Sequence, residues 1–319
     1  MNIAIMTSGG DSSGMNAAIK KFVEYSIFKG HTPYFIYEGL EGLIDNKIKK
    51  AGYKDVSGII SRGGTIIRSS RSKRWYEKSF RKTAYENLKK NRIDAIIVLG
   101  GDGSFRALEI FYDEFKIPFM GIPATIDNDI PLNEYTIGVD TALNVIRHAI
   151  DEIRDTASSF NRAFIIETMG RECGYLALTS AISNGAEMCL IPEIQYNLEN
   201  LKKKFLNEIK EGRSYFIAIV AEGLKITETI KKWFEDEIGF ETRTTILGHI
   251  QRGGSPTVLE RLRAAEFMVK ALDNIEKNPN RIVTFYNDRF ILRELKDILN
   301  SNYSLDKEML NIAKPLMGV

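Results

Sequence analysis

The alternation of short apolar segments with glycine-rich turns and helical patterns constrains the fold of this chain more than any other feature. Residues 2–7 (NIAIMT) are mostly apolar, residues 9–14 are rich in glycine, and residues 15–28 carry apolar side chains at helical spacing. Residues 93–99 (IDAIIVL) repeat the pattern before a second glycine turn and an expected helix at 104–115. Continuous apolar strands alternating with helices are typical of parallel sheets covered on both faces. The sequence therefore predicts an α/β fold.

The same alternation continues to the end of the chain. Further strands are expected at 118–122, 163–167, 188–191, 215–220 and 281–285, and further helices near 142–153, 176–182, 198–211, 227–238 and 259–275. At roughly 100–200 residues per domain, 319 residues indicate about two domains. The first division is expected near Gly138, and the glycine-rich segment 253–256 indicates a second crossing. We therefore expect two discontinuous domains, 1–138 plus 251–301 and 139–250 plus 302–319.

Composition excludes several classes of protein. Hydrophobic residues make up 44% of the chain and charged residues 27%, which is ordinary globular usage, and the formal net charge is only +2. So small a charge argues against general nucleic-acid binding. Two cysteines, Cys173 and Cys189, cannot form a disulfide scaffold. The first residues lack the basic segment of a signal peptide, and no apolar run approaches the ~18 residues of a membrane helix. We expect a cytoplasmic enzyme that binds neither nucleic acid nor membrane.

Two glycine-rich turns follow expected strands and are candidate phosphate sites. Residues 7–16 (TSGGDSSGMN) have the glycine spacing of a P-loop, but Met15-Asn16 replaces its Lys-Ser/Thr pair, and the dinucleotide pattern GxGxxG is absent. A tight turn with a helix cap is the alternative. Residues 100–104 (GGDGS) place Asp102 where a carboxylate could hold Mg²⁺ beside phosphates. Here the alternative is that Asp102 is a helix N-cap.

An acidic loop and a group of cations complete the candidate chemistry. Residues 123–129 (PATIDND) are expected on an exposed loop, where a carboxylate could accept the proton of an attacking hydroxyl; an Asx-rich turn is the alternative. Arginine side chains match phosphate oxygens, although any one of them is more often a surface charge, and a lone histidine is more often structural. The cationic candidates near strand ends or loops are Arg162, Arg171, Arg243, His249 and Arg252.

Six motifs together resemble the bacterial-type 6-phosphofructokinase family, in order and spacing, over nearly the whole chain. They are TSGGDSSGMNAAI, RGGT (62–65), LGGDGS, TIDND, MGRECG (169–174) and LGHIQRGGSP (247–256). The resemblance implies two Rossmann-like three-layer domains with mostly parallel sheets and an active site in the cleft between them. It also implies a homotetramer and the transfer of a phosphoryl group from ATP to the 1-hydroxyl of fructose 6-phosphate.

The resemblance also implies roles for individual residues. The first domain would bind the nucleotide and the second the sugar phosphate. The nucleotide-phosphate site would comprise Gly10, Arg71, Ser72, Gly101, Asp102, Gly103 and Ser104, with Asp102 anchoring Mg²⁺. Asp127 would be the catalytic base, beside Thr125 and Asp129. The sugar and the γ-phosphate of ATP would contact Met169, Gly170 and Arg171, and Arg171 would also be catalytic. Glu222 would accept from sugar hydroxyls, and His249 and Arg252 would bind the 6-phosphate. A neighbouring subunit would supply Arg162 and Arg243.

Several positions depart from the family pattern. An effector site would comprise Lys20, Arg154, Gly185, Glu187 and Arg213, but Glu24, Tyr53 and Glu211 stand where basic residues are usual. We therefore expect a weak response to ADP and phosphoenolpyruvate. At the nucleotide site, Leu40 and Ser72 replace aromatic residues and Ala107 replaces a glycine, which puts strict ATP preference in question. Small residues also replace a proline and a glycine at Ser13 and Ala124.

Three alternatives remain from the sequence. Relatives that use pyrophosphate usually carry Asp and Lys at the positions of Gly103 and Ala124, and the small residues here leave room for ATP. A non-catalytic sugar-phosphate sensor would be expected to lose Asp102, Asp127 or Arg171, and all three are present. A nicotinamide oxidoreductase is disfavoured by the missing GxGxxG motif.

Overall fold

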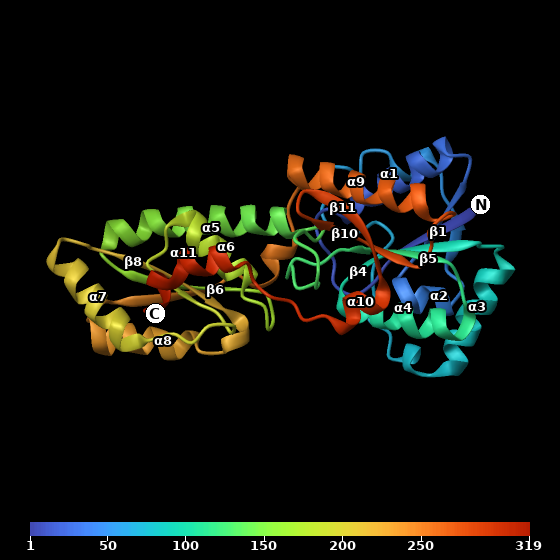
Figure 1. Cartoon of the computed structure of the whole chain (residues 1–319). Coiled ribbons are helices and arrows are strands. Elements are labelled where there is room, and N and C mark those ends of the chain that lie inside the picture. The colour runs from blue at the N-terminus through green and yellow to red at the C-terminus, as the bar shows by residue number, and fades with distance from the viewer. The chain divides into compact units, whose positions relative to one another are not determined.

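The computed structural model describes all 319 residues, and the chain forms two compact units (Figure 1). Unit 1 comprises Met1–Thr141 and Arg252–Tyr303, and unit 2 comprises Ala142–Gln251 and Ser304–Val319. The chain thus passes between the units at 141/142, 251/252 and 303/304. The expected divisions were 138/139, 250/251 and 301/302, so each lies within a few residues of an observed one.

Unit 1 contains a seven-stranded sheet with the strand order β11-β10-β5-β4-β1-β2-β3. The five inner strands are parallel, whereas β3 and β11 pair antiparallel at the two edges. The strands are β1 Asn2–Thr7, β2 Thr32–Ile36, β3 Ile48–Lys50, β4 Ala95–Gly100, β5 Phe119–Pro123, β10 Arg281–Tyr286 and β11 Arg289–Glu294.

Helices cover both faces of this sheet. Helices α1 (Met15–Phe28) and α9 (Val258–Asn274) lie on one face, and α2 (Gly39–Ile44), α3 (Lys78–Lys90), α4 (Asp102–Phe115) and α10 (Leu295–Asn300) lie on the other (Figure 1). Alternate residues of β4 supply the two cores: Ile97 and Leu99 pack with α1 and α9, whereas Ile96 and Val98 pack with α3 and α4. This alternation is the pleat of a strand buried on both sides.

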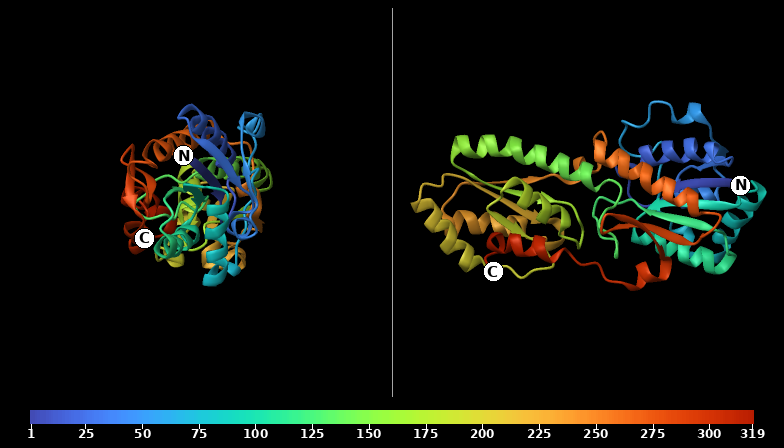
Figure 2. Two further views of the ribbon diagram at one scale, coloured as in Figure 1. Left: turned by 90° about the vertical axis from the view of Figure 1, so that its right-hand side faces the viewer. Right: turned by 45° about the horizontal axis from the view of Figure 1, so that its top comes forward.

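Unit 2 contains a four-stranded, fully parallel sheet with the order β7-β8-β6-β9, again lying between helices (Figure 2). Its aromatic core on one face is formed by Phe205, Phe216 and Phe234. Its strands are β6 Ala163–Thr168, β7 Met188–Leu190, β8 Phe216–Ala221 and β9 Thr242–Ile246. Its helices are α5 Val139–Phe160, which begins in unit 1, α6 Tyr175–Asn184, α7 Leu198–Lys210, α8 Thr227–Trp233 and α11 Lys307–Met317.

The expected α/β class with mainly parallel sheets is confirmed, but the sequence missed four strands. Strands β2, β3, β9 and β11 all depart from a continuous apolar run: β2 contains Pro33, β3 reads IKK, β9 reads TRTTI and β11 is flanked by charges. Three of them lie at sheet edges, where one side of the strand is unpaired and polar residues are tolerated. No helix of the chain combines the length and the apolar character needed to cross a membrane.

Candidate active site

The two glycine turns pack against each other at the carboxyl ends of β1 and β4. The Ser8 amide donates to the Leu99 carbonyl at 2.9 Å. A Cβ added to Gly100 would lie 2.5 Å from the Ser104 Oγ and 2.9 Å from the Ser8 carbonyl oxygen, and Gly9 has a φ of +87°. Only glycine permits this close approach. Both candidate phosphate turns therefore lie side by side at one edge of one sheet, where α/β folds bind ligands.

Asp102 is the first residue of α4, and Gly101 rather than Asp102 occupies the N-cap position. The Asp102 Oδ2 accepts from the Arg106 Nε at 2.9 Å, and 41% of the Asp102 side chain is exposed. A Cβ on Gly103 would meet no atom within 4 Å. No cluster of three or more His, Cys, Asp or Glu side chains is arranged to hold a metal ion. One exposed carboxylate beside an open glycine turn fits Mg²⁺ that takes its other ligands from phosphates and water.

The acidic loop lies directly after β5, and the expectation that it is exposed was wrong. Asp127 and Asn128 are each only 1% exposed. The Asn128 amide donates to the Glu134 carbonyl at 3.1 Å and its oxygen accepts from the Thr136 N–H at 2.9 Å. The Thr136 hydroxyl donates to the Thr125 carbonyl at 2.6 Å. The segment around Glu134 and Thr136 thus folds back over the loop and holds it in place. The polar character of the loop had suggested exposure and gave no sign of this covering segment.

Arg252 lies against the first glycine turn. Its guanidinium donates to the Asp11 carbonyl at 3.1 Å, and a Cβ on Gly10 would stand only 2.4 Å from the guanidinium Nη1. The Ser13 hydroxyl donates to the Gly253 carbonyl at 2.9 Å. Two motifs about 240 residues apart in sequence are therefore in contact within unit 1.

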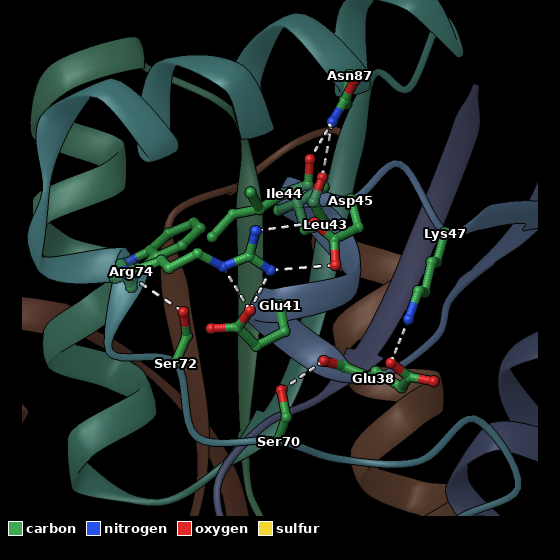
Figure 3. Close-up of polar contacts among 11 residues, drawn as sticks. Glu38, Glu41, Leu43, Ile44, Asp45, Lys47, Ser70, Ser72, Arg74 and Asn87 are labelled. Atoms are coloured by element: carbon green, nitrogen blue, oxygen red, sulfur yellow. Dashed lines mark hydrogen bonds and ion pairs between the residues drawn. The ribbon is translucent and has the colours of Figure 1, made fainter.

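The loop that carries Arg71 and Ser72 is anchored at both ends, as Figure 3 shows. The Ser70 hydroxyl donates to the Glu38 carbonyl at 2.6 Å. Arg74 donates from Nε to Glu41 at 2.7 Å, and its two terminal nitrogens reach Asp45 at 2.9 and 3.0 Å. Hydrogen bonds from Arg74 lower the pKa of both carboxyls, Glu41 and Asp45. Arg74 therefore joins the loop to helix α2.

The three departures expected at the nucleotide site lie close to this loop. The Ser72 hydroxyl accepts from the Trp75 N–H at 3.1 Å, and the Trp75 indole donates to the Ala107 carbonyl at 3.2 Å. Trp75 is 4% exposed and Leu40 is 7% exposed, and both belong to the core beneath α3 and α4. Arg71 itself is exposed. Trp75 was not expected from the sequence to contribute, yet it hydrogen-bonds to Ser72 and Ala107, two of the three positions that differ from the family pattern.

In unit 2, the segment after β6 is held by two side chains. The Gly170 and Arg171 N–H groups both donate to the Glu222 Oε1, at 3.3 and 2.9 Å, and the Met169 N–H donates to the Gln251 Oε1 at 3.1 Å. Arg171 adopts a left-handed φ of +55°, an unusual conformation for arginine. Glu222 thus orients the loop that carries Arg171.

Gln251 is a functional candidate that sequence reasoning missed, although it lies inside a quoted motif. It is 0% exposed, and besides accepting from Met169 it donates to the Gly248 carbonyl at 3.0 Å. His249, between these positions, is exposed. A buried amide that satisfies backbone groups on two loops has no signature in sequence.

One carboxylate in unit 2 is shared by Arg162, which directly precedes β6, and Arg243 of the adjacent parallel strand β9. Arg162 donates from Nε to Glu241 at 2.9 Å, and Arg243 donates to the other oxygen of Glu241 at 2.5 Å. Register pairs Phe164 of β6 with Arg243 of β9, which brings the two arginines together. More than half of the Arg243 side chain is exposed, at 53%.

The basic residues of the expected effector site already contact carboxylates or a backbone carbonyl. In unit 2, Arg213 contacts Glu187 at 2.7 Å and Glu208 at 2.7 Å, and Arg154 donates to the Asn184 carbonyl beside Gly185. Burial raises the pKa of Glu187.

In unit 1, Lys20 contacts Glu24 at 2.6 Å. Lys21, which could have compensated for Glu24, also lies 3.6 Å from it.

The structure thus distributes the sequence-predicted residues between the two units. Unit 1 contains Gly10, Arg71, Ser72, Gly101, Asp102, Gly103, Ser104, Thr125, Asp127, Asp129 and Arg252, and unit 2 contains Arg162, Met169, Gly170, Arg171, Glu222, Arg243 and His249.

Comparison with known proteins identifies the family. Residues 2–275 match the sequence model of the family described as Phosphofructokinase. The chain belongs to the phosphofructokinase family. The resemblance drawn from its six motifs is confirmed.

Other members of the phosphofructokinase family match nearly the full chain. A protein of Sulfurovum sp. (strain NBC37-1) named ATP-dependent 6-phosphofructokinase is 58% identical, over 98% of this chain and 96% of the relative. A protein of the same name from Sulfurimonas denitrificans is 56% identical, over 98% and 99%. The solved structure of phosphofructokinase from Saccharomyces cerevisiae has 34% identity and a TM-score of 0.89, covering 94% of this chain and 45% of the yeast chain. This chain therefore spans about half the length of the yeast protein.

Proposed function

We propose that this chain is a glycolytic kinase that transfers the γ-phosphoryl group of ATP to the 1-hydroxyl of fructose 6-phosphate, giving fructose 1,6-bisphosphate and ADP. The observation that carries the proposal is that the turn containing Asp102 and the loop containing Asp127 follow neighbouring parallel strands, β4 and β5, in a member of the phosphofructokinase family. Its relatives with 58% and 56% identity are named as ATP-dependent, so the pyrophosphate-dependent alternative is not favoured.

In unit 1, the two glycine turns are proposed to bind the nucleotide phosphates through backbone N–H groups and the N-terminus of α4. Arg71 would add a charged contact from its anchored loop. Asp102 would hold Mg²⁺, which would supply positive charge to neutralise the phosphates. Asp127 would accept the proton of the sugar 1-hydroxyl, with Thr125 and Asp129 beside it.

In unit 2, the loop that includes Met169 and Gly170 is proposed to contact the sugar, and Arg171 to screen charge on the transferring group. Glu222 holds this loop through its Oε1, which leaves Oε2 to accept from a sugar hydroxyl. His249 of this unit and Arg252 of unit 1 would bind the 6-phosphate. Phosphoryl transfer depends mainly on positioning and charge neutralisation, so these contacts account for most of the catalysis expected.

The assembly is proposed to be a homotetramer, with Arg162 and Arg243 completing a neighbour's sugar-phosphate site. Two observations fit this role: Arg162, directly before β6, and Arg243 of β9 share the Glu241 carboxylate, and Arg243 is largely exposed. We propose that the enzyme is cytoplasmic, because its two cysteines form no disulfide and free thiols are typical of a reducing compartment.

A coupled assay on the purified protein tests the proposed reaction. ADP release is followed with ATP, Mg²⁺ and fructose 6-phosphate, and fructose 1,6-bisphosphate formation is followed with pyrophosphate in place of ATP. We expect turnover with ATP to be far above turnover with pyrophosphate. Turnover with pyrophosphate alone would refute the donor, and the absence of turnover with either donor would favour a non-catalytic sensor.

A further inference from the structure

A buried carboxylate outside the expected site joins three of its loops. Glu260, on the first turn of α9, is 0% exposed. Its Oε1 accepts from the Gly138 N–H at 2.7 Å, and its Oε2 accepts from the Thr141 N–H at 3.1 Å and the Thr141 hydroxyl at 3.2 Å. The next residue after Gly138 begins α5, so Glu260 caps that helix from a different helix. All of these residues belong to unit 1.

The first glycine turn rests on the same carboxylate. A Cβ on Gly14 would lie 3.0 Å from both Cγ and Oε1 of Glu260, and 2.5 Å from a methyl of Ile137. The Ser12 hydroxyl donates to the Ile137 carbonyl at 2.7 Å. The end of the phosphate turn therefore packs directly against Glu260 and leaves no room for a side chain at position 14.

The acidic loop is connected to Glu260 through the segment before Gly138. The Ile137 N–H donates to the Pro123 carbonyl at 2.9 Å, and Thr136 bonds both the Thr125 carbonyl and the Asn128 side chain. The carboxylate thus fixes the end of the segment that lies over Asp127. A shift at Gly138 would be transmitted to the loop within two residues.

The Arg252 segment is tied to the same point. Thr257, the N-cap of α9, accepts from the Glu260 N–H at 3.0 Å, and its hydroxyl donates to Asp140 in the first turn of α5. The Thr257 N–H donates to the Thr141 hydroxyl at 3.4 Å. The first turns of α5 and α9 therefore cap each other, and Arg252 lies five residues before this junction.

We propose that Glu260 is a positioning residue for the phosphoryl transfer, which sets the phosphate turn and the Asp127 loop in a fixed relation to each other. The proposal rests on the proposed function. Glu260 does not touch the reacting groups; it acts through Gly138, Thr141 and Gly14. A displacement of about 1 Å in a reacting group can lower a rate by a factor of roughly 10².

Hydrogen-bond donors face both side-chain oxygens of Glu260, so both oxygens must accept. Only a carboxylate has two accepting oxygens. The Gly138 N–H, the Thr141 N–H and the Thr141 hydroxyl all donate to these oxygens, and the two N–H groups belong to the backbone and cannot rotate. In Glu260→Gln, the amide NH₂ would face either the Gly138 or the Thr141 N–H, so one buried donor would lose its acceptor. Burial raises the pKa of Glu260, and the hydrogen bonds from the Gly138 and Thr141 N–H groups oppose this rise because they favour the carboxylate.

The test compares Glu260→Gln with Leu272→Ala, a change in the buried apolar core of the same helix. We expect Glu260→Gln to lower kcat about tenfold or more and to weaken ATP binding measured by calorimetry. Leu272→Ala should lower Tm by at least as much while keeping kcat within about twofold at 25 °C. A loss of kcat in Glu260→Gln without a matching loss in Leu272→Ala would distinguish a positioning role from a general loss of stability.

Thr141→Val keeps the test decisive if Glu260→Gln does not fold. It removes the hydroxyl contact to Glu260 and the long 3.4 Å contact from the Thr257 N–H, and it leaves both backbone contacts of Glu260. We expect a two- to threefold loss of kcat with little change in Tm. Unchanged kcat in the folded variants, or the same loss of kcat in Leu272→Ala at equal loss of Tm, would overturn the positioning role. An inactive wild type would instead refute the proposed function, and the calorimetric comparison of ATP binding would still test Glu260.

Discussion

Replacing Gly10 with alanine tests whether the first glycine turn and the Arg252 motif work as one unit. The added Cβ would stand 2.4 Å from the Arg252 Nη1, whereas real Cβ atoms essentially never approach other heavy atoms within 3.0 Å. Because the obstacle is the far end of a flexible side chain, the guanidinium would move by about 1 Å and the backbone would remain. We expect the free energy of unfolding to change by less than about 1 kcal/mol.

The functional cost follows from what Arg252 is proposed to bind. A hydrogen bond between charged groups contributes about 1.5–3 kcal/mol, and 1.4 kcal/mol corresponds to a factor of ten in binding. Partial loss of one such contact with the 6-phosphate should raise KM for fructose 6-phosphate about tenfold. Displacement should also break the 3.1 Å hydrogen bond from Arg252 to the Asp11 carbonyl.

Steady-state kinetics on a double-mutant cycle measures this coupling. Gly10→Ala, Arg252→Ala and the double variant are compared, with Gly52→Ala as control because its Cβ would meet only Asp55, at 3.9 Å. If Gly10→Ala acts through Arg252, the double variant will have the KM of Arg252→Ala alone. Additive effects, or a rise confined to KM for ATP that persists without Arg252, would refute the reasoning.

Four further outcomes are expected. Asp127→Ala should lower kcat at least ~10²-fold, as expected on loss of a general base, while KM for fructose 6-phosphate changes less; near-normal kcat would contradict the role of Asp127. Mixing inactive Arg243→Ala and inactive Asp127→Ala proteins under subunit exchange should restore some activity, and no recovery despite proven exchange would place the whole site within one chain. Arg74→Lys should raise KM for ATP severalfold without changing KM for fructose 6-phosphate, because lysine cannot replace the forked contacts of arginine; equal changes in both constants would argue against a local role. ADP and phosphoenolpyruvate should barely shift the fructose 6-phosphate saturation curve, because the basic effector residues already contact carboxylates or a backbone carbonyl; a large shift abolished by Arg154→Ala would show a working effector site.

The sequence by itself determined the fold class and the places where chemistry gathers. Runs such as residues 95–100 are apolar on both sides because helices cover both faces of the sheet. One such strand is therefore enough to predict a sheet between two layers of helices. The glycine turns after β1 and β4 could also be predicted from the sequence. Only glycine fits where the backbone packs as closely as Gly100 does against Ser104. These signals are local: each depends on a few consecutive residues and on nothing distant.

Only the tertiary structure decided which distant groups meet and which polar side chains are buried. Strand β9 forms although it reads TRTTI, because pairing with β6 outweighs its weak apolar pattern. Asp127 is buried because the hydrogen bond between Thr136 and Asn128 holds the next segment over it. In the sequence, Glu260 is an ordinary helix carboxylate; only the fold shows that its oxygens accept from the Gly138 and Thr141 N–H groups. Hydrogen bonds across more than a hundred residues leave no periodicity and no composition bias in the sequence. They depend on the closure of long loops in the folded chain, and so the positioning of this site could be learned only from the fold.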